Sequence, residues 1–256
     1  MSCSKTLILF DVDGTIAESS KKVKDSILIK LSFLKGNKYE YGLISGGKYE
    51  KIINQVGYHY IDPNKGPLFK YLFCENGMIG YLNNEKFFER RLDKLYTYNQ
   101  FKNIEKYILD SSKKYLVNNH NSKLERRNSM WYFSPAGVYC NDEYRKSFVK
   151  DDIKNNIRLK IIELLKEKLK TRYNLEIRLG GNIGLTIYPT GWDKSYIIKN
   201  KLLDISKYKN VYFFGDRCSE NGNDYPLYIL PEITGIKVNN PDDTLEILTD
   251  IDNNIL

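Results

Sequence analysis

Apolar runs of strand length alternate with longer amphipathic stretches in the first third of the chain and again near its end. The run Thr6–Phe10 is followed by an amphipathic stretch that ends near Leu34, and the same succession recurs further along. Strands separated by helices predict a parallel sheet with helices on its faces. The chain closes with a predicted helix that begins at Pro241 and carries acidic residues in its first turn. The predicted strands of this part are Thr6–Phe10, Tyr41–Ser45, Tyr71–Cys74, Val211–Phe214 and Ile236–Val238.

The pattern changes between residues 82 and 188, where short strands are mixed with two long helices. We predict a polar helix over about Asp93–Leu116 and a second helix over Ile153–Arg172, whose apolar residues share one face. Just before this region, Glu75-Asn76-Gly77 predicts a hairpin turn. The mixture predicts an antiparallel α+β module, residues 82–188, inserted into an α/β core formed by residues 1–81 and 189–256. The predicted strands of the module are Lys123–Arg127, Met130–Ser134, Leu175–Leu179 and Ile183–Tyr188.

Composition places the chain among ordinary globular proteins. Its 256 residues are 41% hydrophobic and 28% charged, which is enough to bury a substantial core. The longest apolar runs are far shorter than a membrane span, and the first one is too short for a signal peptide. The cysteines lack metal-ligand spacing, so we expect a reduced cytoplasmic protein with neither zinc nor disulfides. These cysteines are Cys3, Cys74, Cys140 and Cys218.

The chain is basic, with 40 Lys and Arg against 32 Asp and Glu and a formal charge of +8. Such an excess suits nucleic acid, anionic small substrates or a general compositional bias equally well. The lysines are spread along the whole chain and do not cluster with aromatic residues. We therefore expect no nucleic-acid partner, and the charge leaves anionic small substrates and a compositional bias as alternatives.

Two aspartates, Asp11 and Asp13, directly follow the first predicted strand. Residues two apart on a strand share a side, so both carboxylates should emerge where open α/β sheets bind ligands. Carboxylates this close raise each other's pKa unless a cation compensates them, and Mg²⁺ takes such oxygen ligands. The alternative is a plain Asp-Gly turn with solvated side chains.

Three further polar segments lie at predicted strand ends or helix starts. Together with the aspartates they offer a carboxylate nucleophile, a second carboxylate for the proton, groups for phosphoryl oxygens and acidic residues for Mg²⁺. Each segment alone has a structural explanation, as a surface helix residue, a turn or a helix cap. Their order and common location favour phosphoryl transfer. The segments are Ser45-Gly46-Gly47, Asp193-Lys194, and Gly215-Asp216 followed by Asn221-Gly222-Asn223-Asp224.

Five segments resemble motifs of the haloacid dehalogenase (HAD) superfamily and, within it, of eukaryotic-type α-phosphomannomutase. The first is general to the superfamily, whereas GWDK after a glycine-bounded strand and the RN…SP segment are specific to the mutase branch. The resemblance implies a Rossmann-like core with an inserted C2-type cap. The segments are FDVDGT (10–15), ENGMIGY (75–81), RNSMWYFSPAG (127–137), GGNIGLTIYPTGWDK (180–194) and FFGDRCSENGND (213–224).

The resemblance also implies an activity and its cofactors. Mannose 6-phosphate and mannose 1-phosphate would be interconverted through an aspartyl-phosphate, with glucose phosphates as further candidates. Glucose 1,6-bisphosphate or mannose 1,6-bisphosphate would be the activator, and the product would enter GDP-mannose biosynthesis. A homodimer formed through the cap is implied as well.

The implied residue roles fall into three groups. Asp11 would be the nucleophile, Asp13 the general acid/base and Lys194 the phosphate anchor. Mg²⁺ would sit on Asp11, the Val12 carbonyl and Asp216. The implied metal-site residues are Asp11, Asp13, Asp216, Asn223 and Asp224, and the implied substrate-binding residues are Ser45, Arg127, Asn128, Arg145, Gly184 and Thr186.

Several positions depart from the family pattern. A third phosphate-binding arginine is expected where the chain has Val138, and a hydroxyl and a carboxylate are replaced by Gly184 and Thr186. A core arginine falls on Ser20, next to Lys21. These changes keep open a sugar-phosphate phosphatase of the same chemistry. A basic interaction protein on a degenerate fold is the third hypothesis, and the intact acidic motifs argue against it.

Overall fold

The computed structural model describes residues 5–34, 38–57, 61–62, 66–115, 122–137 and 140–252. The chain separates into two compact units. The first comprises Met1–Glu89, Asp193–Glu220 and Asp224–Leu256, and the second comprises Arg90–Trp192 and Asn221–Asn223. The sequence placed the division at residues 82 and 188. In each unit a sheet positions the polar residues of interest.

The first unit is built on a seven-stranded sheet with the order β13-β12-β1-β2-β5-β6-β7. The first five strands of this order run parallel, and β6 and β7 continue the sheet antiparallel. The mixed α/β class and the parallel sheet predicted from the sequence are therefore confirmed. The strands are β1 (Thr6–Phe10), β2 (Tyr39–Ile44), β5 (Phe69–Cys74), β6 (Ile79–Leu82), β7 (Glu85–Glu89), β12 (Asn210–Gly215) and β13 (Thr234–Lys237), with a separate pair β3 (Ile61–Asp62) and β4 (Gly66–Pro67).

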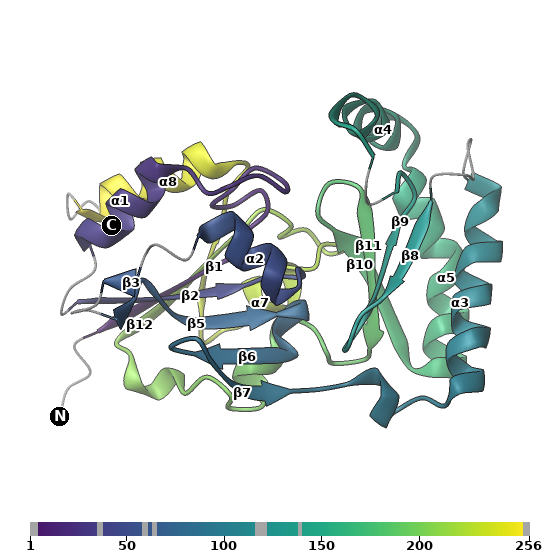
Figure 1. Ribbon diagram of the computed structural model, residues 1–256, viewed down its shortest axis with the longest axis horizontal. Coiled ribbons are helices and arrows are strands. Elements are labelled where there is room, and N and C mark those ends of the chain that lie inside the picture. Colours follow the sequence, from purple (N-terminus) through teal and green to yellow (C-terminus); the bar gives the residue numbers. More distant parts are fainter. Residues whose placement is uncertain are drawn as a thin grey trace. The chain divides into compact units, whose positions relative to one another are not determined.

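Strand alternation divides the core of this unit into two hydrophobic layers. Ile8 and Phe10 of β1 face a layer that includes residues of α1 (Asp25–Leu34), α2 (Tyr49–Val56) and α8 (Pro241–Asp252). Leu7 and Leu9 face the opposite layer, with α6 (Tyr196–Lys199) and α7 (Tyr225–Tyr228). Figure 1 shows α1 and α8 side by side. Each fully buried side chain of this kind stabilises the fold by about 1.5–3 kcal/mol, which fixes the central strands firmly.

The strand β7 was missed from the sequence, and its residues were assigned to the inserted module. It pairs with β6 at the edge of the first sheet, and most of its side chains are exposed. An edge strand without a buried face has no hydrophobic alternation to reveal it. The preceding hairpin turn is confirmed: Glu75-Asn76-Gly77 lies between β5 and β6, and Asn76 has φ 59°.

The second unit holds a four-stranded antiparallel sheet with the order β10-β11-β9-β8. Helices α3 and α5 contribute to the hydrophobic cluster on one face of it, around Trp131, Phe133 and Leu185. The elements of this unit are α3 (Tyr98–Ser112), β8 (Lys123–Arg126), β9 (Trp131–Ser134), α4 (Asp142–Asn155), α5 (Ile157–Tyr173), β10 (Leu175–Gly180) and β11 (Gly184–Pro189). Across both units, short 3-10 helices occupy Glu75–Gly77, Leu92–Lys94, Lys113–Tyr115 and Ile205–Lys207.

Both helix predictions in this unit need correction. The first helix begins at Tyr98 because Thr97 caps it, in a reciprocal capping box with Gln100. Its predicted end at Leu116 lies outside the described residues. The predicted helix Ile153–Arg172 corresponds to α5 but begins too early, because Ile153 belongs to α4, a helix that the sequence analysis did not predict. The two helices are separated at Asn156, which adopts the left-handed conformation with φ 53°. Asparagine tolerates that conformation, so the chain turns there without losing helix on either side.

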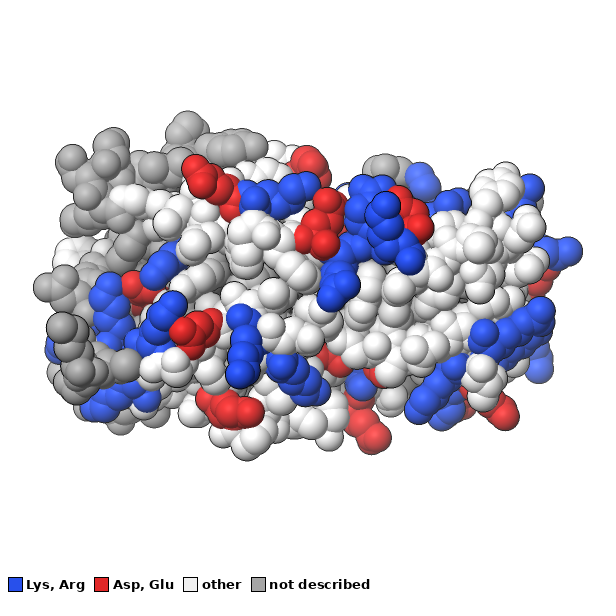
Figure 2. Space-filling model, turned by 90° about the horizontal axis from the view of Figure 1, so that it is seen from below, with Lys and Arg blue, Asp and Glu red and all other residues white. Residues whose placement is uncertain are grey.

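Charged side chains on the surface are mixed in sign. Figure 2 shows that Lys and Arg form several small groups on the displayed face, with Asp and Glu among them. In the part of the chain that the structure describes, no helix combines the length and the apolar character needed to cross a bilayer.

A buried ion pair joins the α4–α5 corner to the β10–β11 turn. The Arg158 Nε donates to Asp152 at 2.7 Å, and both side chains are more than nine-tenths buried. Arg158 Nη1 also donates to the carbonyl oxygens of Gly181 and Gly184, at 2.9 and 3.2 Å. Removing one partner would leave the other charge buried without compensation.

We expect Arg158→Met to lower the free energy of unfolding by about 3–5 kcal/mol, because Asp152 is left ionised in the interior. Adding Asp152→Asn should recover part of the loss, since the amide oxygen can still accept a hydrogen bond from the backbone N–H of residue 158. Urea unfolding of the two variants checks this. A double variant less stable than the single one would contradict it.

Candidate functional site

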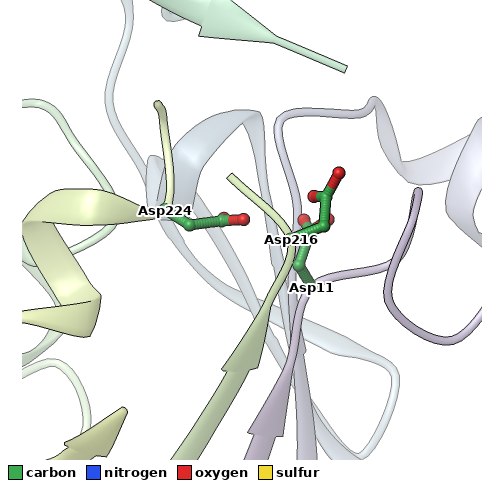
Figure 3. A group of neighbouring side chains, drawn as sticks. All are labelled: Asp11, Asp216 and Asp224. Carbon is green, nitrogen blue, oxygen red and sulfur yellow. The ribbon is translucent and has the colours of Figure 1, made fainter. Parts of the chain in front are cut away.

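Three aspartates meet at the carboxyl ends of two neighbouring strands. Asp11 follows β1, Asp216 follows β12, and Asp224 immediately precedes α7. Ligand oxygens of the three carboxyl groups lie within 4.8 Å of one another. Figure 3 shows the Asp224 side chain extended toward Asp11 and Asp216. The edge that the sequence indicated for Asp11 therefore brings Asp11 together with two carboxylates from the distant segment that contains Asp216 and Asp224.

Lys194 is fully buried and joins two of these aspartates. Its Nζ donates to Asp11 Oδ1 at 2.5 Å, to Asp224 Oδ1 at 2.6 Å and to the carbonyl oxygen of Ile44, which ends β2, at 2.9 Å. Burial alone would lower the lysine pKa, but the attraction of Asp11 and Asp224 raises it above its usual value. The ammonium is therefore charged, and the alternative of a solvated surface lysine is excluded.

The carboxylates outnumber the buried ammonium. Burial, reinforced by the neighbouring aspartates, raises the Asp11 pKa well above its usual value despite Lys194. Burial and then Asp224 raise the pKa of Asp216 to about 7. Full ionisation at neutral pH therefore needs another positive charge, and clustered carboxylate oxygens are the ligands that Mg²⁺ takes. The donor set fits a divalent cation held by Asp11, Asp216 and Asp224.

Gly14 gives Asp216 the room that this cluster needs. A Cβ at Gly14 would lie 2.5 Å from Asp216 Oδ2, and the glycine has φ +92°. The Asp-Gly turn after β1 is therefore shaped by the acidic cluster, and no other residue fits there without strain. The Val12 carbonyl oxygen, an implied metal ligand, already accepts backbone N–H groups from Thr15, Ile16 and Ala17 within this turn.

Asp13 has surroundings of its own. Its carboxylate forms an ion pair with Lys51 and accepts hydrogen bonds from Gln55 Nε2 at 2.9 Å and from the Ser20 N–H at 2.8 Å. Burial alone would raise the Asp13 pKa, but Lys51 and the other donors lower it below its usual value. In the described part of the chain, Asp13 is not a member of the cluster of three aspartates.

Ser45 and Asn76 are buried beside the carbonyl that Lys194 contacts. Ser45 directly follows Ile44, its Oγ accepts from the Gly47 N–H at 3.1 Å, and its carbonyl accepts from the Asn76 N–H at 2.9 Å. Within the described part of the chain, neither polar atom of the Asn76 side chain has a hydrogen-bond partner.

The second unit holds the remaining substrate-binding candidates. Arg127 forms an ion pair with Glu125 at 2.9 Å, and its guanidinium lies 4.6 Å from the centre of the Tyr132 ring. Gly184 and Thr186 lie buried on β11. The other candidates are Asn128, exposed in the β8–β9 turn, and Arg145, half-buried on α4, while Val138 lies outside the described residues. Asn223, an implied metal-site residue, also belongs to this unit.

Sequence reasoning missed Lys51 and Gln55, the two side chains that hold Asp13. They stand four residues apart on α2, which places them on one helix face, and this spacing was the available signal. Lys21, the cation that the sequence offers beside the first motif, instead pairs with the exposed Glu18.

Comparisons with known proteins agree with this arrangement. Residues 29–254 match the family model described as eukaryotic phosphomannomutase. The chain is 35% identical to a phosphomannomutase of Encephalitozoon cuniculi, covering 94% of this chain and 91% of the relative. It is 32% identical to the phosphomannomutase of Saccharomyces cerevisiae, with 97% and 95% covered.

Solved structures share the fold at low identity. The structure of SMU.1108c from Streptococcus mutans has a TM-score of 0.62 at 14% identity, covering 97% of this chain and 98% of that one. The C-terminal domain of C. albicans trehalose-6-phosphate phosphatase has a TM-score of 0.61 at 17% identity, with 96% and 91% covered. The fold and the acidic site define a HAD-type enzyme with a second unit inserted in its core. More specifically, the chain belongs to the eukaryotic phosphomannomutase family.

Mg²⁺ should stabilise the protein more at pH 8 than at pH 5.5. The pKa of Asp216 in the metal-free fold, about 7, exceeds its unfolded value of about 3.9. Its contribution to stability is therefore complete below pH 4 and is lost as the pH rises through 7. A bound cation offsets this loss, because it stabilises the folded protein by about 2.7 kcal/mol when its free concentration is a hundred times its Kd. Melting temperatures of the protein and of Asp216→Asn check this. An equal Mg²⁺ shift in both proteins would contradict it.

We expect Gly14→Ala to weaken Mg²⁺ binding by about 10- to 100-fold, because the added methyl displaces Asp216. Gly57→Ala is the matched control: Gly57 also has a positive φ, +83°, but nothing lies within 4 Å of an added Cβ. Both variants should lose about 1–3 kcal/mol of stability from backbone strain. Only Gly14→Ala should change a calorimetric Mg²⁺ titration, and similar affinities in the two variants would refute the argument.

Proposed function

We propose that the protein is a Mg²⁺-dependent phosphomannomutase that interconverts mannose 6-phosphate and mannose 1-phosphate and also accepts glucose phosphates. The observation that carries the proposal is the buried Lys194 ammonium, bonded to both Asp11 and Asp224 beside Asp216, in a member of this family. A buried lysine between carboxylates is costly to build for stability alone. Its positive charge lies beside Asp11, where it would offset the negative charge of a transferring phosphoryl group.

Asp11 is the proposed nucleophile. Because Lys194 bonds Oδ1, we assign the attack on phosphorus to Oδ2. A bond between Asp11 and phosphorus forms as the bond from phosphorus to the sugar oxygen breaks, which gives an aspartyl-phosphate and a free sugar hydroxyl. When bound to the three aspartates, Mg²⁺ would neutralise charge on the transferring phosphoryl group.

Asp13 is the proposed proton carrier. Its low pKa keeps it ionised at neutral pH, ready to accept the proton of the sugar hydroxyl that attacks the aspartyl-phosphate. It returns that proton to the leaving sugar oxygen in the opposite direction. Lys51 and Gln55 hold the carboxylate in one orientation throughout.

The second unit is the proposed source of specificity. Arg127, Asn128 and Arg145 would bind the remote phosphate, and Gly184 and Thr186 would border the sugar. Glucose 1,6-bisphosphate or mannose 1,6-bisphosphate would phosphorylate Asp11 and start the cycle. We further propose a cytoplasmic homodimer formed through this unit, acting in GDP-mannose biosynthesis.

A sugar-phosphate phosphatase is the second candidate. The observation that favours it is the ion pair between Arg127 and Glu125, which already neutralises one phosphate-binding cation. A mutase must retain the bisphosphate while it reorients, whereas a phosphatase releases its product after one hydrolysis. Weaker binding of the remote phosphate therefore favours hydrolysis over isomerisation.

Incubation with mannose 1-phosphate, Mg²⁺ and catalytic glucose 1,6-bisphosphate should yield mannose 6-phosphate. We expect Asp11→Asn to abolish this turnover and Asp13→Asn to lower it by about 10²–10⁴-fold. Asp25→Asn, at an exposed carboxylate of α1, is the control and should keep full activity. Chromatographic identification of the product decides between the candidates, because release of inorganic phosphate without mannose 6-phosphate would establish the phosphatase.

A further inference from the structure

A polar row crosses the sheet of the second unit, one residue per strand. On β10, Arg178 pairs in register with Thr186 of β11. Thr186 pairs with Tyr132 of β9, which pairs in turn with Glu125 of β8. Phe133, the strand neighbour of Tyr132, belongs to the hydrophobic cluster. Because strand neighbours point to opposite faces, the row lies on the face away from that cluster.

Tyr132 fills the space that a side chain at position 184 would need. A Cβ at Gly184 would lie 2.1 Å from the phenol oxygen of Tyr132 and 2.2 Å from its Cζ. The Tyr132 hydroxyl therefore lies where the side chain of residue 184 would begin. The family resemblance implies a hydroxyl on β11 at this point, and the neighbouring strand supplies one instead.

Two guanidinium groups flank the Thr186–Tyr132 pair on this face. Arg127 stacks on the Tyr132 ring at 4.6 Å. Arg178 lies on the other flank, with its side chain 22% exposed and its Nη2 3.8 Å from the Glu176 carboxylate. Neighbouring strands are about 4.8 Å apart, and only β11 separates Arg178 on β10 from Tyr132 on β9, so these two side chains can reach one substrate. A guanidinium fork suits phosphate oxygens.

We propose that Arg178 and Tyr132 bind the part of the substrate remote from the reacting phosphoryl group. Arg178 holds the second phosphate of a hexose bisphosphate, and the Tyr132 hydroxyl bonds a sugar hydroxyl. The inference rests on the proposed function, whose cycle includes such a bisphosphate. Arg178 would act together with Arg127 and Arg145 in a chain that has valine at position 138, where a third arginine is expected.

The Arg178 part is tested by calorimetry on the full-length Asp11→Asn protein with Mg²⁺, which leaves glucose 1,6-bisphosphate intact. Adding Arg178→Gln should raise the Kd for the bisphosphate at least about tenfold, the scale of a charge-assisted hydrogen bond. Arg178→Lys should lie between the two. Arg172→Gln, at an exposed arginine of α5, is the control and should change nothing. A Kd for Arg178→Gln within twofold of the parent would overturn this part.

The Tyr132 part is tested with Tyr132→Phe, which keeps the ring over Gly184 and under Arg127 and removes only the oxygen. In the same background the Kd for glucose 1-phosphate should rise about three- to tenfold, the scale of a neutral hydrogen bond. Tyr98→Phe, at an exposed tyrosine of α3, is the matched control. A structural role alone would lower the melting temperature and leave the Kd unchanged, which would overturn this part.

Failure of the inference and failure of the proposed function give different results. If the proposed function fails, the unsubstituted protein forms no mannose 6-phosphate. If only the inference fails, that assay succeeds, and Arg178→Gln and Tyr132→Phe bind both sugar phosphates as the parent does. Absence of any bisphosphate binding by the parent would overturn the inference as well.

Discussion

The buried ammonium of Lys194 is the interaction on which the rest of the first unit depends. Removing a charge from water costs several kcal/mol even after the protein relaxes, so it must be surrounded by acceptors. Those acceptors come from the residue after β1, the end of β2 and the residue before α7. The network therefore ties three separate segments to one point at the carboxyl edge of the sheet. One ammonium for three carboxylates also leaves negative charge, which a divalent cation would compensate.

Asp11 and Asp13 are two residues apart, yet their environments move their pKa values in opposite directions. Burial among carboxylates raises the pKa of Asp11, and Lys51 lowers that of Asp13. Such a separation is how one site provides two carboxylates with different roles. A metal on the cluster would lower the pKa of Asp11, the proposed nucleophile, while Lys51 lowers the pKa of Asp13, the proposed proton carrier. The difference between the two pKa values thus follows from which helix or strand faces each side chain.

Local patterns predict the strands that carry the site and much less of what surrounds them. The predicted bounds of the first strand, Thr6–Phe10, agree with β1 residue for residue, because a short apolar run that ends at two aspartates indicates a buried strand. Lys194 alone looks like a surface residue, since only the tertiary fold brings Asp11 and Asp224 to it. The break at Asn156 was missed because apolar periodicity continues across it, and β7 was missed because its side chains are exposed. What escapes prediction is contact between side chains from distant segments.

The departures from the family pattern in the second unit have to be interpreted together. Considered alone, Gly184 replaces a residue with a hydroxyl group, and this change would weaken recognition of the sugar. In the structure the same glycine makes room for the Tyr132 phenol, and the strand beyond Thr186 adds Arg178. With threonine in place of the expected carboxylate at position 186, this face carries one negative charge fewer beside Arg178, which favours an anion. The changes therefore form one rearranged polar surface, and strong binding of a second phosphate remains compatible with it. In the proposed mutase cycle, Arg127, Arg145 and Arg178 would together hold the bisphosphate while it reorients.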